Sequence, residues 1–161
     1  MNAQLATNTV LHPIGPAALD PPHRPRPLGA VSAELGFPSP AEDFEDGAID
    51  LNELLVRNEP ATFFYRASGW SMLLAGICDG DFLAVDRSVR PVDGDVVLAV
   101  WDGNAPACKV LRLFADHIEL HSANPEHAPI VFAGGAEVEV FAVVAVARQI
   151  KRERAGHVRS R

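Results

Sequence analysis

Short stretches rich in β-branched and aromatic residues, separated by turn dipeptides, fill the second half of this 161-residue chain. Turn signals such as Asp93-Gly94 and Asn124-Pro125 stand between them. Many short strands joined by tight turns are typical of antiparallel pairing. The expected strands are residues 81–86, 95–101, 107–114, 117–121 and 138–146. The sequence therefore predicts a mainly β fold, a compact domain of short antiparallel strands with one or two short helices and an extended N-terminal arm.

The first 35 residues differ in character because they are rich in proline. Proline lacks a backbone donor and interrupts helices and strands. The prolines of this stretch include Pro13, Pro16, Pro21, Pro22, Pro25 and Pro27. We expect an extended, mobile arm over residues 1–35, with no continuous strand or helix and no room for a DNA-reading helix-turn-helix. The globular domain is then expected over residues 36–150, followed by a basic C-terminal tail over 151–161.

One segment between the arm and the strands has the pattern of a helix. Residues 49–57 carry apolar side chains at helical spacing and acidic ones near the N-terminal end, and Pro60 is expected to stop the helix. Residues 62–67 then predict a strand that leads into a turn at Ser71, after which a short helix is expected to begin at Met72. A side chain at such a junction is expected to be exposed, with free backbone N–H groups nearby that can stabilise an oxyanion.

Ser71 and Lys109 are the candidate catalytic residues. A serine hydroxyl is a weak nucleophile that needs a neighbouring base, and a lysine among apolar residues can lose its proton, because burial lowers the pKa of an amine. The chain has one other lysine, Lys151. The rest of its Lys and Arg residues are arginines, which stay protonated and cannot act as a base. Taken singly, a serine after a glycine is more often a turn residue and a strand lysine is more often solvated. Taken together, the two indicate a serine-lysine dyad.

Several motifs, in matching order and spacing, resemble the LexA/UmuD-type family of serine-lysine self-cleaving peptidases. They are Gly36–Asp43 (GFPSPAED), Ile49–Leu55 (IDLNELL), Gly69–Met72 (GWSM), Asp79–Asp86 (DGDFLAVD) and Gly94–Val97 (GDVV). The resemblance covers roughly residues 36–150 and implies a LexA/signal-peptidase-like β domain. It also implies that Ser71 is the nucleophile, that Lys109 is the general base, and that the protein cuts the Leu35-Gly36 bond of its own arm.

The same resemblance implies a cellular role in the SOS response to DNA damage. In relatives of the UmuD type, a RecA filament on single-stranded DNA stimulates the cut, and the shortened dimer then serves a UmuC-type, error-prone translesion polymerase. A homodimer, a RecA filament and a UmuC-type polymerase are therefore the expected partners. Relatives usually place alanine or cysteine before the scissile glycine, where this chain has Leu35. That difference leaves a second interpretation open, a non-cleaving binding module that regulates a polymerase.

Composition and charge exclude other classes of protein. The formal net charge of −7 argues against direct binding to DNA, because phosphate contacts need arrays of lysine and arginine. No uninterrupted apolar run reaches the roughly 20 residues that span a bilayer. The N-terminus also lacks the basic start and apolar stretch of a secretory signal. We expect a cytoplasmic protein that neither contacts a membrane nor binds DNA sequence-specifically.

No metal or cofactor is expected. The two cysteines, Cys78 and Cys108, lack a zinc-binding spacing and are interpreted as small core residues. His117 and His121 would share one face of a strand, but no cluster of carboxylates or cysteines is expected to join them. Glycines of the strand region such as Gly76 and Gly80 stand singly, without the glycine-rich loop that holds a nucleotide phosphate.

Overall fold

The computed structural model describes residues 9–23, 26–27 and 48–150, and the predicted cleavage site Leu35-Gly36 lies outside them. Within these residues the protein is mainly β, as predicted, with one eight-stranded and one two-stranded antiparallel sheet. The large sheet contains β1 (Val10–Pro16), β4 (Thr62–Ser68), β5 (Phe82–Asp86), β6 (Val96–Trp101), β7 (Ala107–Leu113), β8 (His117–His121), β9 (Ile130–Ala133) and β10 (Val138–Ala147). The small sheet pairs β2 (Arg26–Pro27) with β3 (Ala48–Ile49). The predicted strands are thereby confirmed as β4 to β8 and β10.

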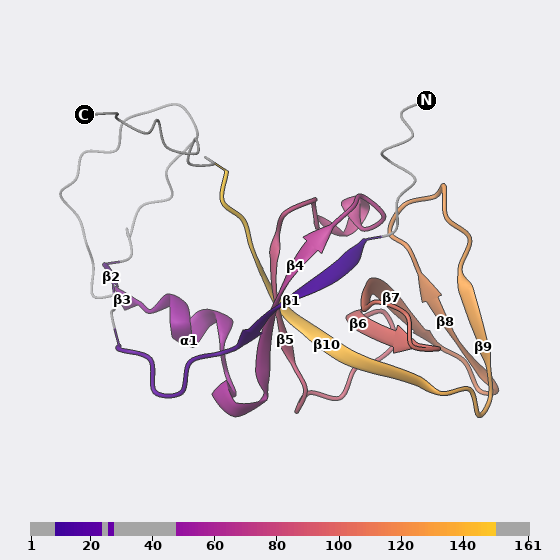
Figure 1. Cartoon of the computed structure of the whole chain (residues 1–161), viewed down its shortest axis with the longest axis horizontal. Coiled ribbons are helices and arrows are strands. Elements are labelled where there is room, and N and C mark those ends of the chain that lie inside the picture. Colours follow the sequence, from indigo (N-terminus) through magenta and orange to yellow (C-terminus); the bar gives the residue numbers. More distant parts are fainter. Residues whose placement is uncertain (1–8, 24–25, 28–47, 151–161) are drawn as a thin grey trace, which may run out of the picture.

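Part of the large sheet closes on itself. The strands follow the order β1-β4-β5-β10-β6-β7, and β1 pairs a second time, with β7, through Val10 and Ala107. The strands β8 and β9 continue the sheet from β7 outside this ring, at the right of Figure 1. Closure removes unpaired strand edges from the ring and leaves β9 as an edge of the sheet.

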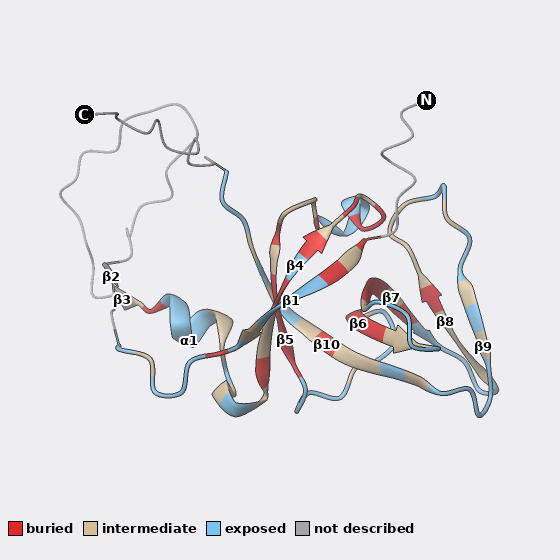
Figure 2. Cartoon of the chain, in the orientation of Figure 1, coloured by how far each residue is buried: buried red, intermediate tan, exposed pale blue. Residues whose placement is uncertain are grey.

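Apolar side chains fill the ring and the space beside it, where Figure 2 shows buried segments on the ring strands. The main cluster contains Leu11, Tyr65, Ala67, Met72, Ile77, Leu83, Val85, Leu98 and Cys108. A second cluster contains Val97, Ala99, Leu111 and Leu120, with Trp101 and Phe132 packed against it. The rings of Trp101 and Phe132 meet edge to face, with centroids 5.8 Å apart. Because side chains alternate along a strand, β7 contributes Cys108 to the first cluster and Leu111, on its other face, to the second.

The strand β1 overturns one expectation for the proline-rich arm. Its residues lie within the first 35, where prolines were predicted to prevent a continuous strand. It runs antiparallel to β4 from Val10, opposite Ser68, to Pro16, opposite Phe63. Leu11 is only 1% exposed and belongs to the main cluster. This part of the predicted arm is therefore a strand of the domain.

The prolines of β1 stand where β4 needs no donor. Leu11 N–H points away from β4, because it donates to a carbonyl just before β7, and N–H directions alternate along a strand. The nitrogen of Pro13 therefore also points away from β4. A bulge between Pro13 and Gly15 shifts this alternation by one residue. The nitrogen of Pro16 therefore also points away from β4, and the next N–H, that of Ala17, donates to the first residue of β4. Neither proline removes a hydrogen bond to β4.

The helix α1 (Leu51–Leu55) is shorter than the predicted helix over 49–57. Asp50 begins it, since its carboxylate accepts a hydrogen bond from Asn52 N–H at 2.8 Å. The helix ends before Val56, whose backbone is extended. The expectation that Pro60 stops the helix is wrong, because Pro60 lies in a separate 3-10 helix, η2 (Glu59–Ala61).

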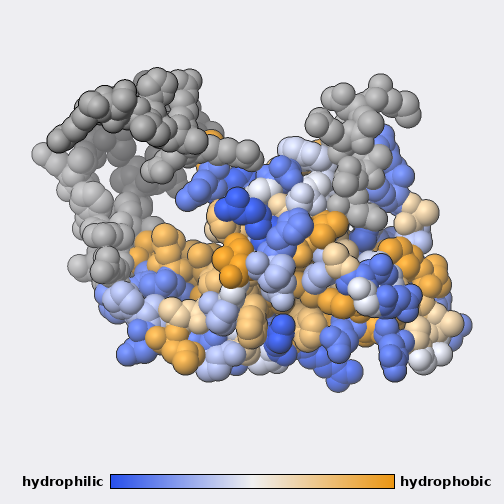
Figure 3. Space-filling model, viewed as in Figure 1, coloured by the Kyte–Doolittle hydropathy of each residue, from blue (hydrophilic) through white to orange (hydrophobic). Residues whose placement is uncertain are grey.

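The helix α1 lies on the surface. Leu51 and Leu54 are 61% and 57% exposed, and Figure 3 shows hydrophobic residues at the surface over this helix. His23 contacts the start of the helix, with Nδ1 3.2 Å from a carboxylate oxygen of Asp50 and 3.1 Å from one of Glu53. Among the described residues, no helix has the length and apolar character needed to cross a membrane.

The place of β1 in the core can be tested within the strand itself. We expect Leu11→Ala to lower the free energy of unfolding by about 2–4 kcal/mol, because it opens a cavity in the main cluster. The matched control is Ile14→Ala, at a residue 54% exposed, which should cost less than about 0.5 kcal/mol. Urea unfolding followed by circular dichroism gives both values. Equal losses would show that β1 is not part of the core.

Candidate active site

The turn that carries Ser71 is fixed on both sides. Gly69, just after β4, has a φ of 108°, a backbone conformation that favours glycine, and its N–H donates to Asp79 Oδ1 at 3.0 Å. After Ser71 the chain forms the 3-10 helix η3 (Leu73–Ala75), one residue later than the expected start at Met72. The expectation of an exposed serine is wrong, because Ser71 has an exposure of 0%. Its hydroxyl is held inside the protein.

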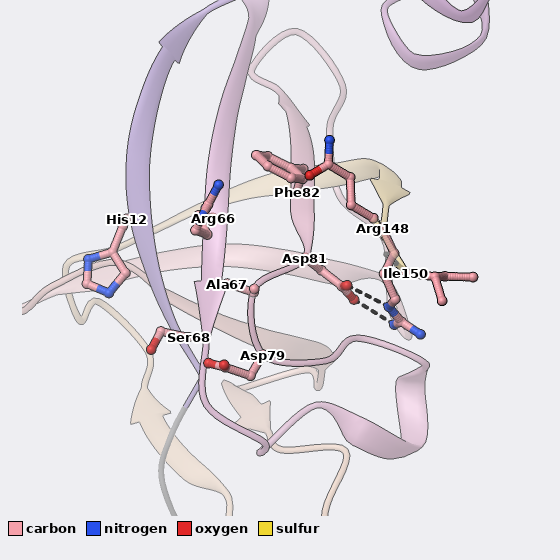
Figure 4. A pocket seen from close by; sticks show the side chains of 11 residues that line it. His12, Arg66, Ala67, Ser68, Asp79, Asp81, Phe82, Arg148 and Ile150 are labelled. Carbon is pink, nitrogen blue, oxygen red and sulfur yellow. Dashed lines mark hydrogen bonds and ion pairs between the residues drawn. The ribbon is translucent and has the colours of Figure 1, made fainter. Parts of the chain in front are cut away.

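A pocket of about 690 Å³ lies beside this turn and is lined by Arg66, Asp79, Asp81 and Arg148 among others (Figure 4). Asp81 accepts hydrogen bonds of 2.6 Å from both Nε and Nη2 of Arg148. Burial acts to raise the pKa of Asp81, but the hydrogen bonds from Arg148 and a backbone N–H lower it below the usual value. Ser71 does not line this pocket. We interpret the side chains that line the pocket as structural, because one of them, Asp79, holds the turn through Gly69.

Lys109 lies within β7, opposite Val97 of β6, and is 2% exposed. Its Nζ donates a hydrogen bond of 2.7 Å to the Oγ of Ser122, just after β8. Burial lowers the pKa of Lys109, an effect that the neighbouring Cys108 opposes. Burial also raises the pKa of Cys108 to about 12, so this thiol is protonated at neutral pH. The predicted burial of the lysine is confirmed, and its amine can release a proton more readily than one in water.

Two sets of contacts join the segments that carry Ser71 and Lys109. Thr9 N–H donates to Ser71 Oγ at 2.7 Å, while Thr9 C=O accepts a hydrogen bond of 3.0 Å from the residue before Lys109. In the second set, Leu74 N–H of η3 donates to the carbonyl of Ala123 at 3.0 Å, next to the serine that binds the lysine amine. The two predicted residues therefore belong to neighbouring parts of one buried region.

Sequence reasoning missed three groups of this region. Ser122 had no motif around it, and only the pairing of β7 with β8 brings it to Lys109. Thr9 lies in the proline-rich stretch that was expected to be an arm. Asp79 stands inside a motif, where its two-residue spacing from Asp81 could have suggested a carboxylate that holds the turn.

Of the expectations for cysteine and histidine, the one for Cys78 needs correction. Cys108 is buried as predicted, whereas Cys78 is only half-buried. His117 and His121 do share a carboxylate, because Glu119 contacts the Nε2 of the first at 3.3 Å and that of the second at 2.6 Å. The described residues nevertheless contain no group of three or more His, Cys, Asp or Glu arranged to hold a metal ion.

Comparison with known proteins identifies relatives along most of the chain. The profile of the family described as Peptidase S24-like matches residues 27–145. Protein ImpA of Salmonella typhimurium is 44% identical over 101 residues, which are 63% of this chain and 70% of the relative. Protein SamA of Salmonella typhimurium strain LT2 is 38% identical over 125 residues, 78% of this chain and 86% of the relative. A LexA repressor of Acidothermus cellulolyticus is 33% identical over 148 residues, 84% of this chain and 51% of the repressor.

The lowered pKa of Lys109 predicts a pH dependence of stability. A charged amine in this place costs stability, because the folded protein binds the proton less tightly than the unfolded chain does. That cost is complete below the folded pKa and disappears as pH rises toward the usual value of 10.5. Lys109→Met should therefore stabilise the protein near pH 7 by about 1–3 kcal/mol, and this gain should shrink toward pH 10. Urea unfolding at several pH values measures it.

The other lysine of the chain provides the control for this prediction. Lys151→Met removes the same charge outside the described residues and should give no pH-dependent gain. A gain for Lys109→Met that stays constant from pH 7 to 10 would contradict the depressed pKa.

Proposed function

Because the chain belongs to the Peptidase S24-like family, which includes serine-lysine self-cleaving peptidases, we propose that it cuts its own chain between Leu35 and Gly36. The family predicted from the motifs is thereby confirmed. Ser71 is the nucleophile of the proposed reaction and Lys109 is the general base. The observation that carries this proposal is the buried amine of Lys109, whose pKa is lowered and which is joined through hydrogen bonds to the region of Ser71.

In the proposed mechanism, the neutral amine of Lys109 takes the proton of the Ser71 hydroxyl. The hydroxyl oxygen attacks the carbonyl carbon of Leu35, and the bond to the nitrogen of Gly36 breaks as Lys109 returns the proton to the leaving amine. This leaves Leu35 as an ester on Ser71. Water, deprotonated by the same amine, then hydrolyses the ester and restores the hydroxyl. Since the scissile bond belongs to the same chain, no bimolecular encounter is required.

Ser122 is the positioning residue of this mechanism. Its Oγ accepts a hydrogen bond from the amine of Lys109, which fixes where the end of a long, flexible side chain lies. Without such a partner, the four-carbon stem of lysine has many rotamers. We infer that Ser122 holds the amine in the orientation needed to reach the Ser71 hydroxyl.

For the cell, we infer the role of the UmuD-type relatives in SOS mutagenesis. In that role a RecA filament stimulates the cut, and the shortened protein, as a homodimer in the cytoplasm, joins a UmuC-type polymerase. The net charge of −7 supports binding to protein partners rather than direct binding to DNA. The competing function is a non-cleaving module with the same partners. Leu35 before the glycine and the hydrogen bond of Thr9 to Ser71 favour that alternative.

Mass spectrometry of the purified protein tests the proposed reaction. Incubation over a range from about pH 5 to 10 should produce a fragment that begins at Gly36. Its rate should rise about tenfold per pH unit below the pKa of Lys109, because only the neutral amine accepts a proton. Ser71→Ala and Lys109→Met should abolish the fragment. Ser68→Ala and Lys151→Met, matched controls for the hydroxyl and the amine, should leave it unchanged.

Two results would speak against this reaction. A rate that is flat over the whole range from about pH 5 to 10 would contradict the neutral lysine as the base, because buried lysines titrate within that range. A chain that stays intact under all these conditions would support the non-cleaving module instead.

Ser122→Ala tests the positioning role. The cleavage rate should fall by about tenfold to a hundredfold, because the amine loses its fixed place. The midpoint of the pH-rate profile should also move to lower pH, since a hydrogen bond that Nζ donates stabilises the ammonium form. Ser122→Thr, which keeps the hydroxyl, should restore both. An unchanged rate, or a midpoint moved to higher pH, would contradict the role.

A further inference from the structure

The strand β1 fills a groove between two strands of the ring. On one side its residues pair with β4 from Val10 to Pro16. On the other side it reaches β7, where Leu11 N–H donates to the carbonyl of Pro106 at 2.7 Å and Thr9 C=O accepts from Cys108 N–H at 3.0 Å. An extended segment held in this way, by backbone hydrogen bonds to both neighbours, is bound as an added strand.

The first described residue of this segment lies against the proposed nucleophile. Thr9 N–H donates to Ser71 Oγ at 2.7 Å, and both residues have an exposure of 0%. The hydrogen bond engages a lone pair of the oxygen that has to attack a carbonyl carbon. The backbone nitrogen of Thr9 lies 2.7 Å from that oxygen and so takes up part of the space around it.

From this geometry we propose that residues 9–16 form a built-in competitor, which occupies the peptide-binding groove of Ser71 and blocks the nucleophile. The groove takes an extended peptide backbone, and one such segment of this chain already lies in it. Another segment reaches Ser71 only after Thr9 has moved away. The inference rests on the proposed function, because it assigns a regulation to the same nucleophile.

The start of β1 is the end that has to open for another segment to reach Ser71. It is held on both sides, because Val10 pairs with Ala107 of β7 and with Ser68 of β4. The buried Oγ1 of Thr9 has no hydrogen-bond partner among the described residues, and a buried hydroxyl without a partner is unfavourable. Withdrawal of Thr9 lets this hydroxyl bind water, while Leu11 stays in the core as the anchor of the strand.

The reactivity of Ser71 in the full-length chain tests the block. Thr9→Pro removes the N–H and places a ring carbon at the serine oxygen, whereas Thr9→Val keeps the N–H and replaces only the unpartnered hydroxyl. Labelling of Ser71 by a fluorophosphonate, followed by mass spectrometry, should be about fivefold to tenfold faster in Thr9→Pro, as expected for the loss of one hydrogen bond. Thr9→Val should label more slowly than the parent, because it removes the buried hydroxyl that favours withdrawal, and Ser71→Ala provides the blank.

A second pair of variants and a second measurement complete the test. Where Thr9→Pro does not fold, Leu11→Ala, which loosens the anchor, should speed labelling, and Ile14→Ala should not. Equal labelling of parent and loosened variants would overturn the block. Hydrogen exchange of the Thr9 amide at the rate of an unfolded chain would overturn it as well. Absence of Ser71 labelling in every variant, with a protected Thr9 amide, would instead overturn the nucleophile of the proposed function.

Discussion

The protein buries the amine of Lys109, and the chemistry proposed for the site follows from that burial. Lys109 lies in the middle of a ring strand with 2% exposure, where a charged ammonium loses most of its hydration. A core composed for stability alone would place an apolar residue there. The surroundings lower the pKa of this lysine and provide a hydroxyl for its hydrogen bond at Ser122. Burial of Lys109 therefore costs stability near neutral pH and also lowers the pKa of its amine, as a general base requires.

Closure of the ring decides how dry this region is. Without β1, one edge of β4 and the start of β7 would be unpaired, and water would reach the hydroxyl. With β1 in place, both Ser71 and Thr9 are fully buried. The same strand that keeps water from the amine and the hydroxyl also fills the space where a substrate peptide would lie. In this site the exclusion of water and the access of a substrate peptide to Ser71 are thus opposed. Movement at the start of β1 favours one over the other.

Local patterns predicted much of this molecule, and contacts between distant segments account for what they missed. Runs of β-branched residues predicted β4 to β8 and β10, because strand propensity and turn residues act locally. The strand β1 was not predicted because each proline, taken by itself, disfavours a strand. In the structure a bulge at Ile14 places both prolines where β4 needs no donor. Likewise, Ser71 and Lys109 stood out through motif and composition. The partners Thr9 and Ser122 depend on strand pairing and register, which no local pattern specifies.

A cut between Leu35 and Gly36 would not by itself release β1. The strand is held by its pairing with β4, the burial of Leu11 and the hydrogen bond from Ala17 to Thr62, and none of these uses the scissile bond. Before the cut, the covalent link keeps the strand at a high effective concentration near its groove. After the cut, retention becomes an equilibrium that depends on protein concentration. Departure would free one edge of β4 and the start of β7, before its pairing with β8 begins at Val110, and such edges accept extended segments of other chains. Cleavage and the exposure of a strand-binding groove are therefore separate steps, and the second is set by how firmly β1 is held.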